Sequence, residues 1–218
     1  MNAPFLVNQS SLTFPQSLSE KYRPTRIAGF IGLDKPRKIL SKLAASPFAS
    51  AWLFTGPSGT GKTSIALALA AEIKAELIHI PSQHCTVSEL EESLRMTQYV
   101  PMAGKRFWLV LVDEADQMTD KAQLALLSKL DATGMRDNCI FIFTCNDTVR
   151  LEARFLSRCK VLEFSSYGLN GHLIELLRRV WQAEAPNAPE PNLTQLTKGI
   201  GGNVREALQL LEIEVLAQ

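Results

Sequence analysis

The chain has 218 residues, of which 46% are hydrophobic, so it is long enough to bury a core in one large domain or in two smaller ones. Lys and Arg number 23 against 22 Asp and Glu. This balance excludes binding to nucleic acid through the overall charge, so any such contact must come from a local patch. The four cysteines, Cys85, Cys139, Cys145 and Cys159, form no CxxC pair, which argues against a zinc knuckle and indicates free thiols in a reducing compartment.

The chain begins with a polar segment. Residues 1–17 are rich in Ser, Asn, Gln and Pro, and we interpret them as a flexible lead-in, with the folded part beginning near Leu18. They contain no basic segment followed by an apolar one, as a secretory signal would. No apolar run in the sequence reaches the length that crosses a bilayer. We therefore expect a cytoplasmic protein with no membrane partner.

From residue 51 onward, short apolar runs alternate with segments of helical periodicity. The runs at residues 51–55, 77–80, 107–112, 140–144 and 160–164 predict strands, and the segments near residues 60–73, 87–97 and 120–133 predict helices. This alternation is typical of an α/β fold, in which a parallel sheet is covered by helices on both faces. We assign this sheet domain to residues 18–165.

After Phe164 the pattern changes to helix alone. Helices are predicted at residues 169–183, 193–197 and 204–216, with a link rich in Pro and Asn at residues 186–191. We therefore expect a small all-helical domain at residues 166–218.

The segment between the first predicted strand and the following helix has the pattern GxxxxGKT. It consists of Gly56, Pro57, Ser58, Gly59, Thr60, Gly61, Lys62 and Thr63, and Ser64 follows. Glycines let successive backbone N–H groups turn inward and form a concavity that binds an anion. Lys62 would reach the β- and γ-phosphates, and Thr63 would place its hydroxyl on Mg²⁺. The sequence thus predicts a site for a nucleoside triphosphate, and the alternative is a glycine-rich turn that binds nothing.

Two carboxylates, Asp113 and Glu114, directly follow a predicted strand, which places them at the phosphate-binding edge of the sheet. Asp113 would help to hold Mg²⁺, and Glu114 would orient and polarise the attacking water. Two acids also follow many strands by chance, so the pair alone is weak support for a catalytic site. Its combination with the phosphate-binding loop is strong support. Asn146, at the end of the next strand, either holds the water near the γ-phosphate or belongs to an ordinary Asn-Asp turn.

An ordered set of short motifs resembles the ATPases of clamp loaders. The motifs are SEKYRP at residues 19–24, FIG at 30–32, GPSGTGKT at 56–63, VDEADQMT at 112–119, TCN at 144–146, SRC at 157–159 and GNVREAL at 202–208. In this order they closely resemble the small subunits of replication factor C, within the AAA+ class. The resemblance, which begins near Leu18, implies a P-loop NTPase (AAA+) sheet domain followed by a helical lid. It also implies ATPase activity with ATP and Mg²⁺, and assembly with other AAA+ subunits.

The resemblance implies which residues surround the base. Tyr22, Arg23 and Pro24 match the segment that packs on the adenine, and Ile31 and Gly32 match residues that line the base. Without the resemblance, residues 21–24 are equally consistent with an ordinary charged turn.

Three further residues match positions that act on the γ-phosphate. Asn146 matches the first sensor residue, Arg205 matches the second sensor in the lid, and Arg158 matches the arginine finger offered to a neighbouring subunit. A guanidinium contributes charge to the transition state and can arrive from another chain. Without the resemblance, Arg205 is equally consistent with a solvated helical arginine. We assign no role to Arg154, which lies near the same predicted interface.

The sequence also departs from those subunits. Loader subunits carry a helical collar after the lid, through which they form a pentameric ring, whereas this sequence ends at Gln218 with the lid, so we expect no collar. The segment at residues 79–85 lacks the Asn-Ala-Ser-Asp sequence that is common in them. A basic run lies upstream at helix-like spacing, and it either follows a phosphate backbone or forms a solvated face. It consists of Lys35, Arg37, Lys38 and Lys42.

We expect an ATPase that couples hydrolysis of ATP to the loading or remodelling of a ring-shaped or other client protein on DNA, during replication or repair. The first alternative is a nucleotide-dependent adaptor or switch with negligible turnover, which the intact Glu114 disfavours. The second is a helicase loader or a Holliday-junction motor built on the same ATPase domain.

Overall fold

The computed structural model describes residues 16–81, 86–102, 104–131 and 134–218. The lead-in predicted for residues 1–17 lies outside the described residues except for its last two. Residues 82–85, which include Cys85 and the end of the segment that departs from the clamp-loader pattern, also lie outside them.

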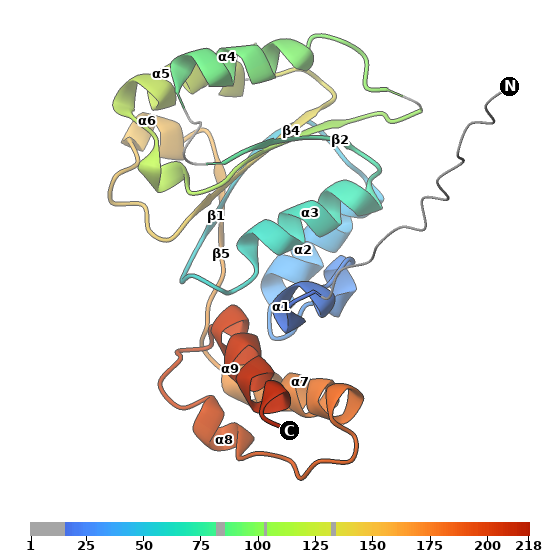
Figure 1. The fold of residues 1–218 in the computed structure, drawn as a ribbon. Coiled ribbons are helices and arrows are strands. Elements are labelled where there is room, and N and C mark those ends of the chain that lie inside the picture. Colours follow the sequence, from blue (N-terminus) through green and yellow to red (C-terminus); the bar gives the residue numbers. More distant parts are fainter. Residues whose placement is uncertain (1–15, 82–85, 103, 132–133) are drawn as a thin grey trace, which may run out of the picture.

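A parallel sheet of five strands forms the centre of the molecule (Figure 1). Its strands are β1 (Ser50–Thr55), β2 (Glu76–Ile80), β3 (Trp108–Val112), β4 (Cys139–Cys145) and β5 (Lys160–Glu163). They lie in the order β2-β3-β4-β1-β5, and every pairing is parallel. The predicted α/β fold is therefore confirmed, with all five predicted strands present. Because the strands are parallel, their carboxyl ends meet at one edge of the sheet.

Helices cover both faces of the sheet, as its buried central strands require (Figure 1). They are α2 (Asp34–Ala45) and α3 (Lys62–Glu72) on one face, and α4 (Val87–Met96), α5 (Asp120–Leu130) and α6 (Ala153–Leu156) on the other. Side chains of β3 alternate between the two cores. Leu109 and Leu111 pack in the core under α2 and α3, and Val110 and Val112 pack in the core under α4, α5 and α6. The apolar strands are thus buried on both faces.

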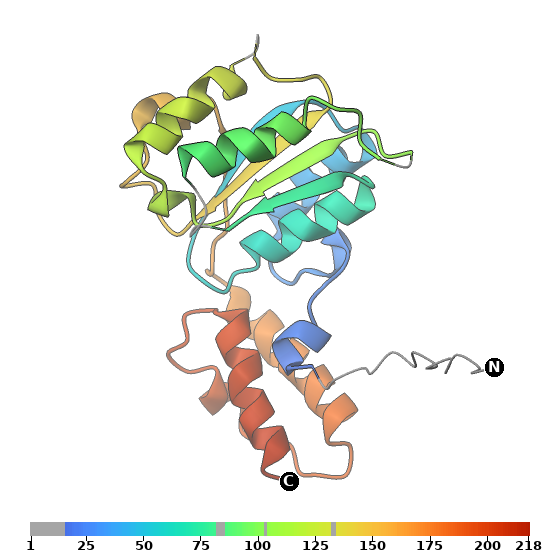
Figure 2. The same ribbon diagram turned by 45° about the horizontal axis from the view of Figure 1, so that its top comes forward.

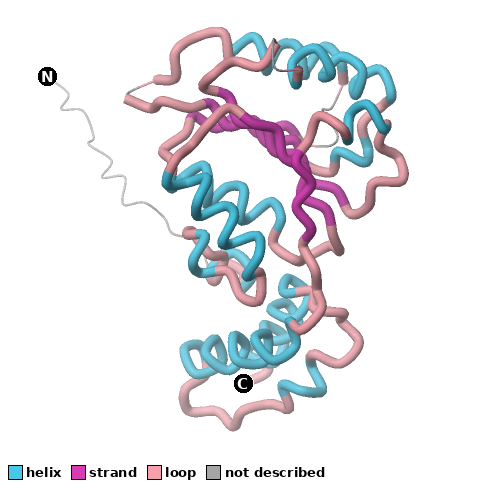
Figure 3. Tube along the Cα trace, turned by 180° about the vertical axis from the view of Figure 1, so that it is seen from behind, coloured by secondary structure: helices cyan, strands magenta, loops and turns pink. Residues whose placement is uncertain are grey.

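Three helices after β5 form a separate bundle, which we call the lid. They are α7 (Leu169–Glu184), α8 (Leu193–Leu196) and α9 (Val204–Leu216). The first helix of the described chain, α1 (Leu18–Lys21), packs against α9 rather than on the sheet (Figure 2). Leu18 is buried in the lid core, and its N–H donates to Glu212 Oε1 at 3.1 Å. The segment before α2 is therefore tied to the lid, which lies beyond one edge of the three-layered part (Figure 3).

Two short 3₁₀ turns complete the described structure. They are η1 (Ile27–Gly29), before α2, and η3 (Ala115–Gln117), directly after the two acids that follow β3. None of the helices in the described part of the chain is long and apolar enough to span a membrane.

Gly56, directly after β1, is closely packed against Phe164, the residue that follows β5. Its φ is +145°, and an added Cβ would lie 2.1 Å from the carbonyl oxygen of Phe164. Phe164 is itself fixed, because its N–H donates to Thr55 O at 2.7 Å. We therefore expect Gly56→Ala to lower the free energy of unfolding by about 2 kcal/mol or more, as measured by chemical denaturation.

Gly171 provides the matched control for this substitution. It lies within α7, and an added Cβ there meets nothing within 4 Å. We expect Gly171→Ala to leave the free energy of unfolding unchanged or to raise it by up to about 1 kcal/mol, because Ala favours a helix over Gly. Equal stability of the two variants would contradict the packing described for Gly56.

Candidate functional site

The predicted phosphate-binding loop connects β1 to α3. Three of its residues, Gly56, Gly59 and Gly61, have positive φ values of +145°, +74° and +92°. These conformations favour glycine, and they allow the loop to expose its backbone N–H groups. Gly61 is the N-cap of α3, so the positive end of this helix dipole faces the loop. The turns at these glycines and the helix N-terminus together suit an anion.

Lys62 is turned onto its own loop. Its ammonium donates to Gly56 O at 2.5 Å, Pro57 O at 2.8 Å and Asn146 Oδ1 at 3.3 Å. Only 8% of the residue is exposed, and this burial lowers the pKa of Lys62 from its ordinary value, while Cys145 and Asp116 act in the opposite direction. A partly buried cation gains from an anionic partner, so Lys62 is suited to receive a phosphate.

Asp113 accepts bonds from three other segments of the chain. Its Oδ1 accepts from Thr63 Oγ1 at 2.8 Å and from Thr144 Oγ1 at 2.9 Å, and its Oδ2 lies 2.8 Å from His79 Nε2. The structure thus brings the predicted magnesium residues Thr63 and Asp113 into direct contact. Hydroxyl and carboxylate oxygens are the ligands that Mg²⁺ prefers, so these two residues fit that ion. The contacts of His79 and Thr144 were not predicted from the sequence.

Glu114 follows with a backbone conformation that is rare for its residue type. Its φ and ψ are both +51°, in the left-handed region. Residues with a Cβ adopt this region at a cost, and such conformations cluster at functional sites. The Glu114 N–H donates to Thr144 Oγ1 at 3.1 Å. Glu114 is thereby fixed directly beside Asp113, at the carboxyl ends of β3 and β4.

A cavity lies between the loop, the segment before α2 and the lid. It brings together ten residues that the sequence assigned to the nucleotide: Tyr22, Arg23, Pro24, Ile31, Gly59, Thr60, Gly61, Thr63, Ser64 and Arg205. Apolar side chains that were not predicted also line it, among them Phe30, Leu176 and Leu208. The lining combines backbone groups of the loop with apolar and cationic side chains, which suits a base joined to phosphates.

Some predicted nucleotide residues do not line this cavity. Gly56, Pro57, Ser58 and Lys62 belong to the loop but lie outside the lining, and so does Gly32. At Gly32, which has a φ of +59°, an added Cβ would lie 2.3 Å from Leu169 Cδ2. Gly32 therefore allows close contact between the segment before α2 and the first turn of α7.

The lid contributes directly to the loop. The N–H of Val204, the first residue of α9, donates to Gly59 O at 3.1 Å. Asn203 caps α9 by accepting from Glu206 N at 3.1 Å, and an added Cβ on Gly59 would lie 1.7 Å from Asn203 Oδ1. Arg205, next to these residues, is thus brought to the cavity by the helix start.

Tyr22 and Lys21 tie the segment before α2 to the lid. The Tyr22 hydroxyl donates a short hydrogen bond to Glu184, and Lys21 Nζ lies 2.8 Å from Glu184 Oε1. Burial, together with Glu184, raises the pKa of Tyr22 to about 12, so the hydroxyl keeps its proton. The side chain predicted to pack on the adenine is therefore anchored to α7.

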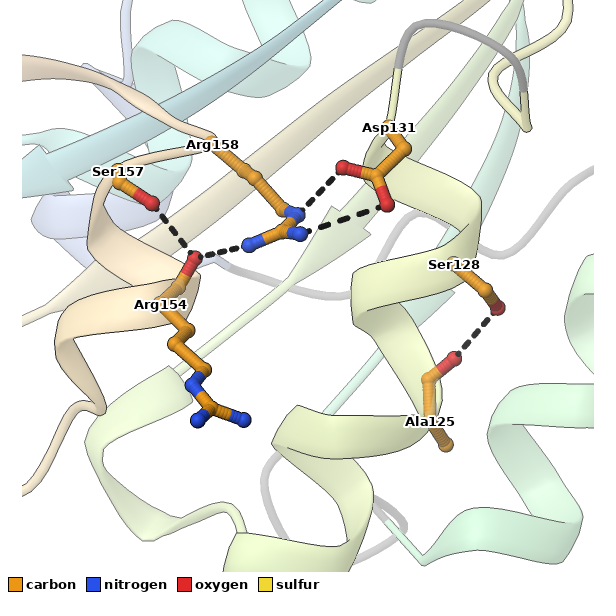
Figure 4. A network of polar contacts seen from close by, with 6 residues as sticks. All are labelled: Ala125, Ser128, Asp131, Arg154, Ser157 and Arg158. Atoms are coloured by element: carbon orange, nitrogen blue, oxygen red, sulfur yellow. Dashed lines mark hydrogen bonds and ion pairs between the residues drawn. The ribbon is translucent and has the colours of Figure 1, made fainter.

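Arg158 lies apart from the cavity, two residues after the end of α6 (Figure 4). Its Nε donates to Asp131 Oδ1 at 2.6 Å, its Nη2 to Asp131 Oδ2 at 3.4 Å and its Nη1 to Arg154 O at 2.8 Å. The side chain of Arg154 points away from this pair (Figure 4). Asp131, 27 residues upstream, was not predicted to hold Arg158.

The basic run on α2 divides into two kinds of residue. Arg37 donates to Ala28 O at 3.1 Å and pairs with Asp34 at 3.6 Å, so it serves the local fold. Lys35, Lys38 and Lys42 are exposed.

Known proteins similar to this chain include small subunits of replication factor C. A family model described as "ATPase family associated with various cellular activities (AAA)" matches residues 52–167. Replication factor C small subunit 1 of Pyrobaculum islandicum is 30% identical over 202 residues, which are 89% of this chain and 60% of that protein. The replication factor C small subunit of Archaeoglobus fulgidus is 29% identical over 200 residues, with shares of 88% and 62%. The chain thus spans about three fifths of the length of these curated relatives.

Solved structures with the same fold include a Holliday junction branch migration motor. The RuvB Holliday junction branch migration motor of Thermotoga maritima matches with a TM-score of 0.71 at 20% identity, over 88% of this chain and 64% of that chain. At this level of identity the likeness concerns the fold alone.

Proposed function

Because the chain belongs to the AAA family of ATPases, we propose that it is a clamp-loader-type ATPase that couples ATP hydrolysis to the loading or remodelling of a client protein on DNA. One observation carries the proposal. Lys62 of the phosphate-binding loop is joined to Asn146, and Thr63 is joined to Asp113 beside Glu114, at the ends of adjacent strands. The groups that phosphoryl transfer requires therefore converge at one edge of the sheet.

Each group has a distinct task in this proposal. Lys62 would exchange its loop carbonyls for the β- and γ-phosphates, and Thr63 and Asp113 would hold Mg²⁺. Bound Mg²⁺ would offset the negative charge that develops on the phosphate oxygens. Glu114 accepts the proton of the attacking water, and Asn146 positions that water near the γ-phosphate. These tasks need positioning and charge compensation rather than a covalent intermediate.

The lid connects the nucleotide to the rest of the molecule. Val204 already contacts Gly59, and Arg205 lines the same cavity. A γ-phosphate adds charge beside Arg205, so its loss after hydrolysis removes one contact that holds the lid to the loop. Through Tyr22 and Glu184 the segment before α2 would follow this movement. The lid thereby reports the state of the nucleotide.

Arg158 acts, in this proposal, on the nucleotide of a neighbouring AAA+ subunit. It lies outside the cavity of its own chain, and Asp131 and the Arg154 carbonyl hold its guanidinium in place. A guanidinium supplied by another chain makes hydrolysis depend on assembly. The partner subunits are copies of this chain or other AAA+ proteins.

A mixing experiment tests this trans arrangement. We expect Arg158→Ala and Glu114→Gln chains to be inactive alone and to recover about a quarter of wild-type turnover when mixed equally, because a random interface unites the two intact parts once in four. Replacing the Glu114→Gln chain with the double variant Arg158→Ala/Glu114→Gln provides the control, because that chain supplies no arginine. If no mixing ratio restored turnover, Arg158 would not act between chains.

The DNA partner is part of the proposal. The curated relatives are replication factor C subunits, so we expect turnover to rise with primed DNA, with the exposed lysines of α2 as candidate contacts. The solved structures of the same fold include a Holliday junction motor, so a four-way junction is the second DNA to test. Stimulation by the junction alone would favour a branch-migration role. ATP binding without turnover on either DNA would favour a switch. A location in the cytoplasm is also part of the proposal, and the free thiols of the described cysteines are compatible with its reducing conditions.

A further inference from the structure

The hydroxyl of Thr144 joins the two acids of the candidate site. Thr144 lies in β4 and is only 3% exposed. Its Oγ1 donates to Asp113 Oδ1 at 2.9 Å and accepts from the Glu114 N–H at 3.1 Å. A hydroxyl has one proton and two lone pairs, so it can make both bonds at once. One buried oxygen thus contacts two successive residues that have different tasks.

The Thr144 hydroxyl restricts the orientation of the Asp113 carboxylate. Oδ1 of Asp113 also accepts from Thr63 Oγ1 at 2.8 Å, while Oδ2 lies near His79. Two hydroxyl donors on one oxygen define the rotation of the carboxyl group about its last bond. Partners that orient a ligating carboxylate in this way contribute to metal affinity, although they do not touch the metal.

The Thr144 hydroxyl also fixes the backbone conformation of Glu114. Glu114 is one of two described non-glycine residues with a positive φ, and its N–H lies beyond the last ladder bond of β3. The bond to Thr144 satisfies this donor and stabilises the left-handed conformation. Since φ and ψ define the direction of the Cα–Cβ bond, this conformation also directs the Glu114 side chain.

We propose that Thr144 is a positioning residue that sets both acids with one hydroxyl: it orients Asp113 for Mg²⁺ and fixes the backbone from which Glu114 reaches the attacking water. This inference rests on the proposed ATPase function. Thr144 does not touch the substrate, and it acts through its two neighbours. Its loss should therefore weaken the use of Mg²⁺ and slow hydrolysis, as two separate effects.

Two substitutions separate positioning from packing. Thr144→Val keeps the shape and the β-branched character but removes the hydroxyl, whereas Thr144→Ser keeps the hydroxyl and removes a methyl group. If Thr144 served packing alone, Val would be the milder change, since it fills the same volume and favours a strand. If Thr144 positions the acids, Ser is the milder change. The two accounts thus predict opposite orders of activity.

The experiment compares the wild-type, Thr144→Val and Thr144→Ser chains in three measurements. These are kcat and KM for ATP at saturating Mg²⁺, the Mg²⁺ concentration that half-saturates binding of a fluorescent ATP analogue, and the unfolding midpoint. We expect Thr144→Val to lower kcat by about 10- to 100-fold and to raise the half-saturating Mg²⁺ concentration by about 10-fold. Thr144→Ser should remain within about threefold of wild type in both.

Other outcomes overturn the inference. If Val matched wild type in both measurements, or if Val and Ser were equally impaired, the hydroxyl would not position the acids. A Thr144→Val chain that kept more activity than Thr144→Ser, with the unfolding midpoints in the same order, would indicate packing alone. A wild-type chain that bound ATP without turnover would contradict the proposed function, and the Mg²⁺ measurement would then still decide the role of Thr144.

Discussion

Glu114→Gln is expected to lower kcat for ATP hydrolysis by about 100- to 10,000-fold, because an amide cannot accept the proton of the attacking water. ATP affinity should remain close to wild type, because in the proposed site Lys62, Thr63 and Asp113 would carry the contacts to phosphate and Mg²⁺. Gln keeps the size of the side chain, and the backbone bond to Thr144 does not depend on the carboxylate. Steady-state turnover and equilibrium binding of ATP measure the two quantities separately.

Glu175→Gln provides the control for this change. Glu175 is exposed on α7, outside the lining of the cavity. The same chemical substitution there should leave turnover unchanged. If Glu114→Gln retained wild-type turnover, another group would activate the water.

Lys62→Ala is expected to weaken ATP binding by about 100-fold or more. Hydrogen bonds to charged groups contribute about 1.5 to 3 kcal/mol each, and the larger value corresponds to about 100-fold in affinity. The ammonium already lies beside the loop, because it bonds Gly56 O, Pro57 O and Asn146 Oδ1. A bound phosphate would replace carbonyl partners with a charged one. Titration calorimetry with ATP and Mg²⁺ measures the change.

The lid provides the control, since Lys198 is exposed and lies outside the cavity lining. Lys198→Ala should bind ATP as tightly as wild type. A Lys62→Ala chain that also bound ATP tightly would contradict the assignment of the loop.

The sheet could be predicted from the sequence because three of its strands, β1, β3 and β4, are almost completely buried. Strand β3 is an unbroken apolar run, and β4 is apolar apart from Thr144, which is typical of central strands in a parallel sheet. The sequence indicates helix α2 less clearly, because its buried positions are limited to Pro36, Leu40 and Leu43. The attachment of α1 to the lid could not be predicted, since Leu18 and Glu212 lie 194 residues apart.

Some features of the candidate site could likewise be predicted from the sequence, and others could not. The loop and the acid pair were predictable, because each is a local pattern whose chemistry depends on neighbouring residues. The contacts of His79 and Thr144 with Asp113 depend on how β2 and β4 pair with β3. No local sequence pattern predicts this register. The pairing of Arg158 with Asp131 likewise depends on how α5 and α6 pack together.

Steady-state ATP hydrolysis across a range of protein concentrations, with and without primed DNA, tests the central claim most directly. The account predicts Mg²⁺-dependent turnover that rises more steeply than linearly with protein, rises further with DNA and is lost in Glu114→Gln. Turnover no higher than that of Glu114→Gln at every concentration, with or without DNA and despite ATP binding, would contradict the claim that this chain is an ATPase completed by its neighbours.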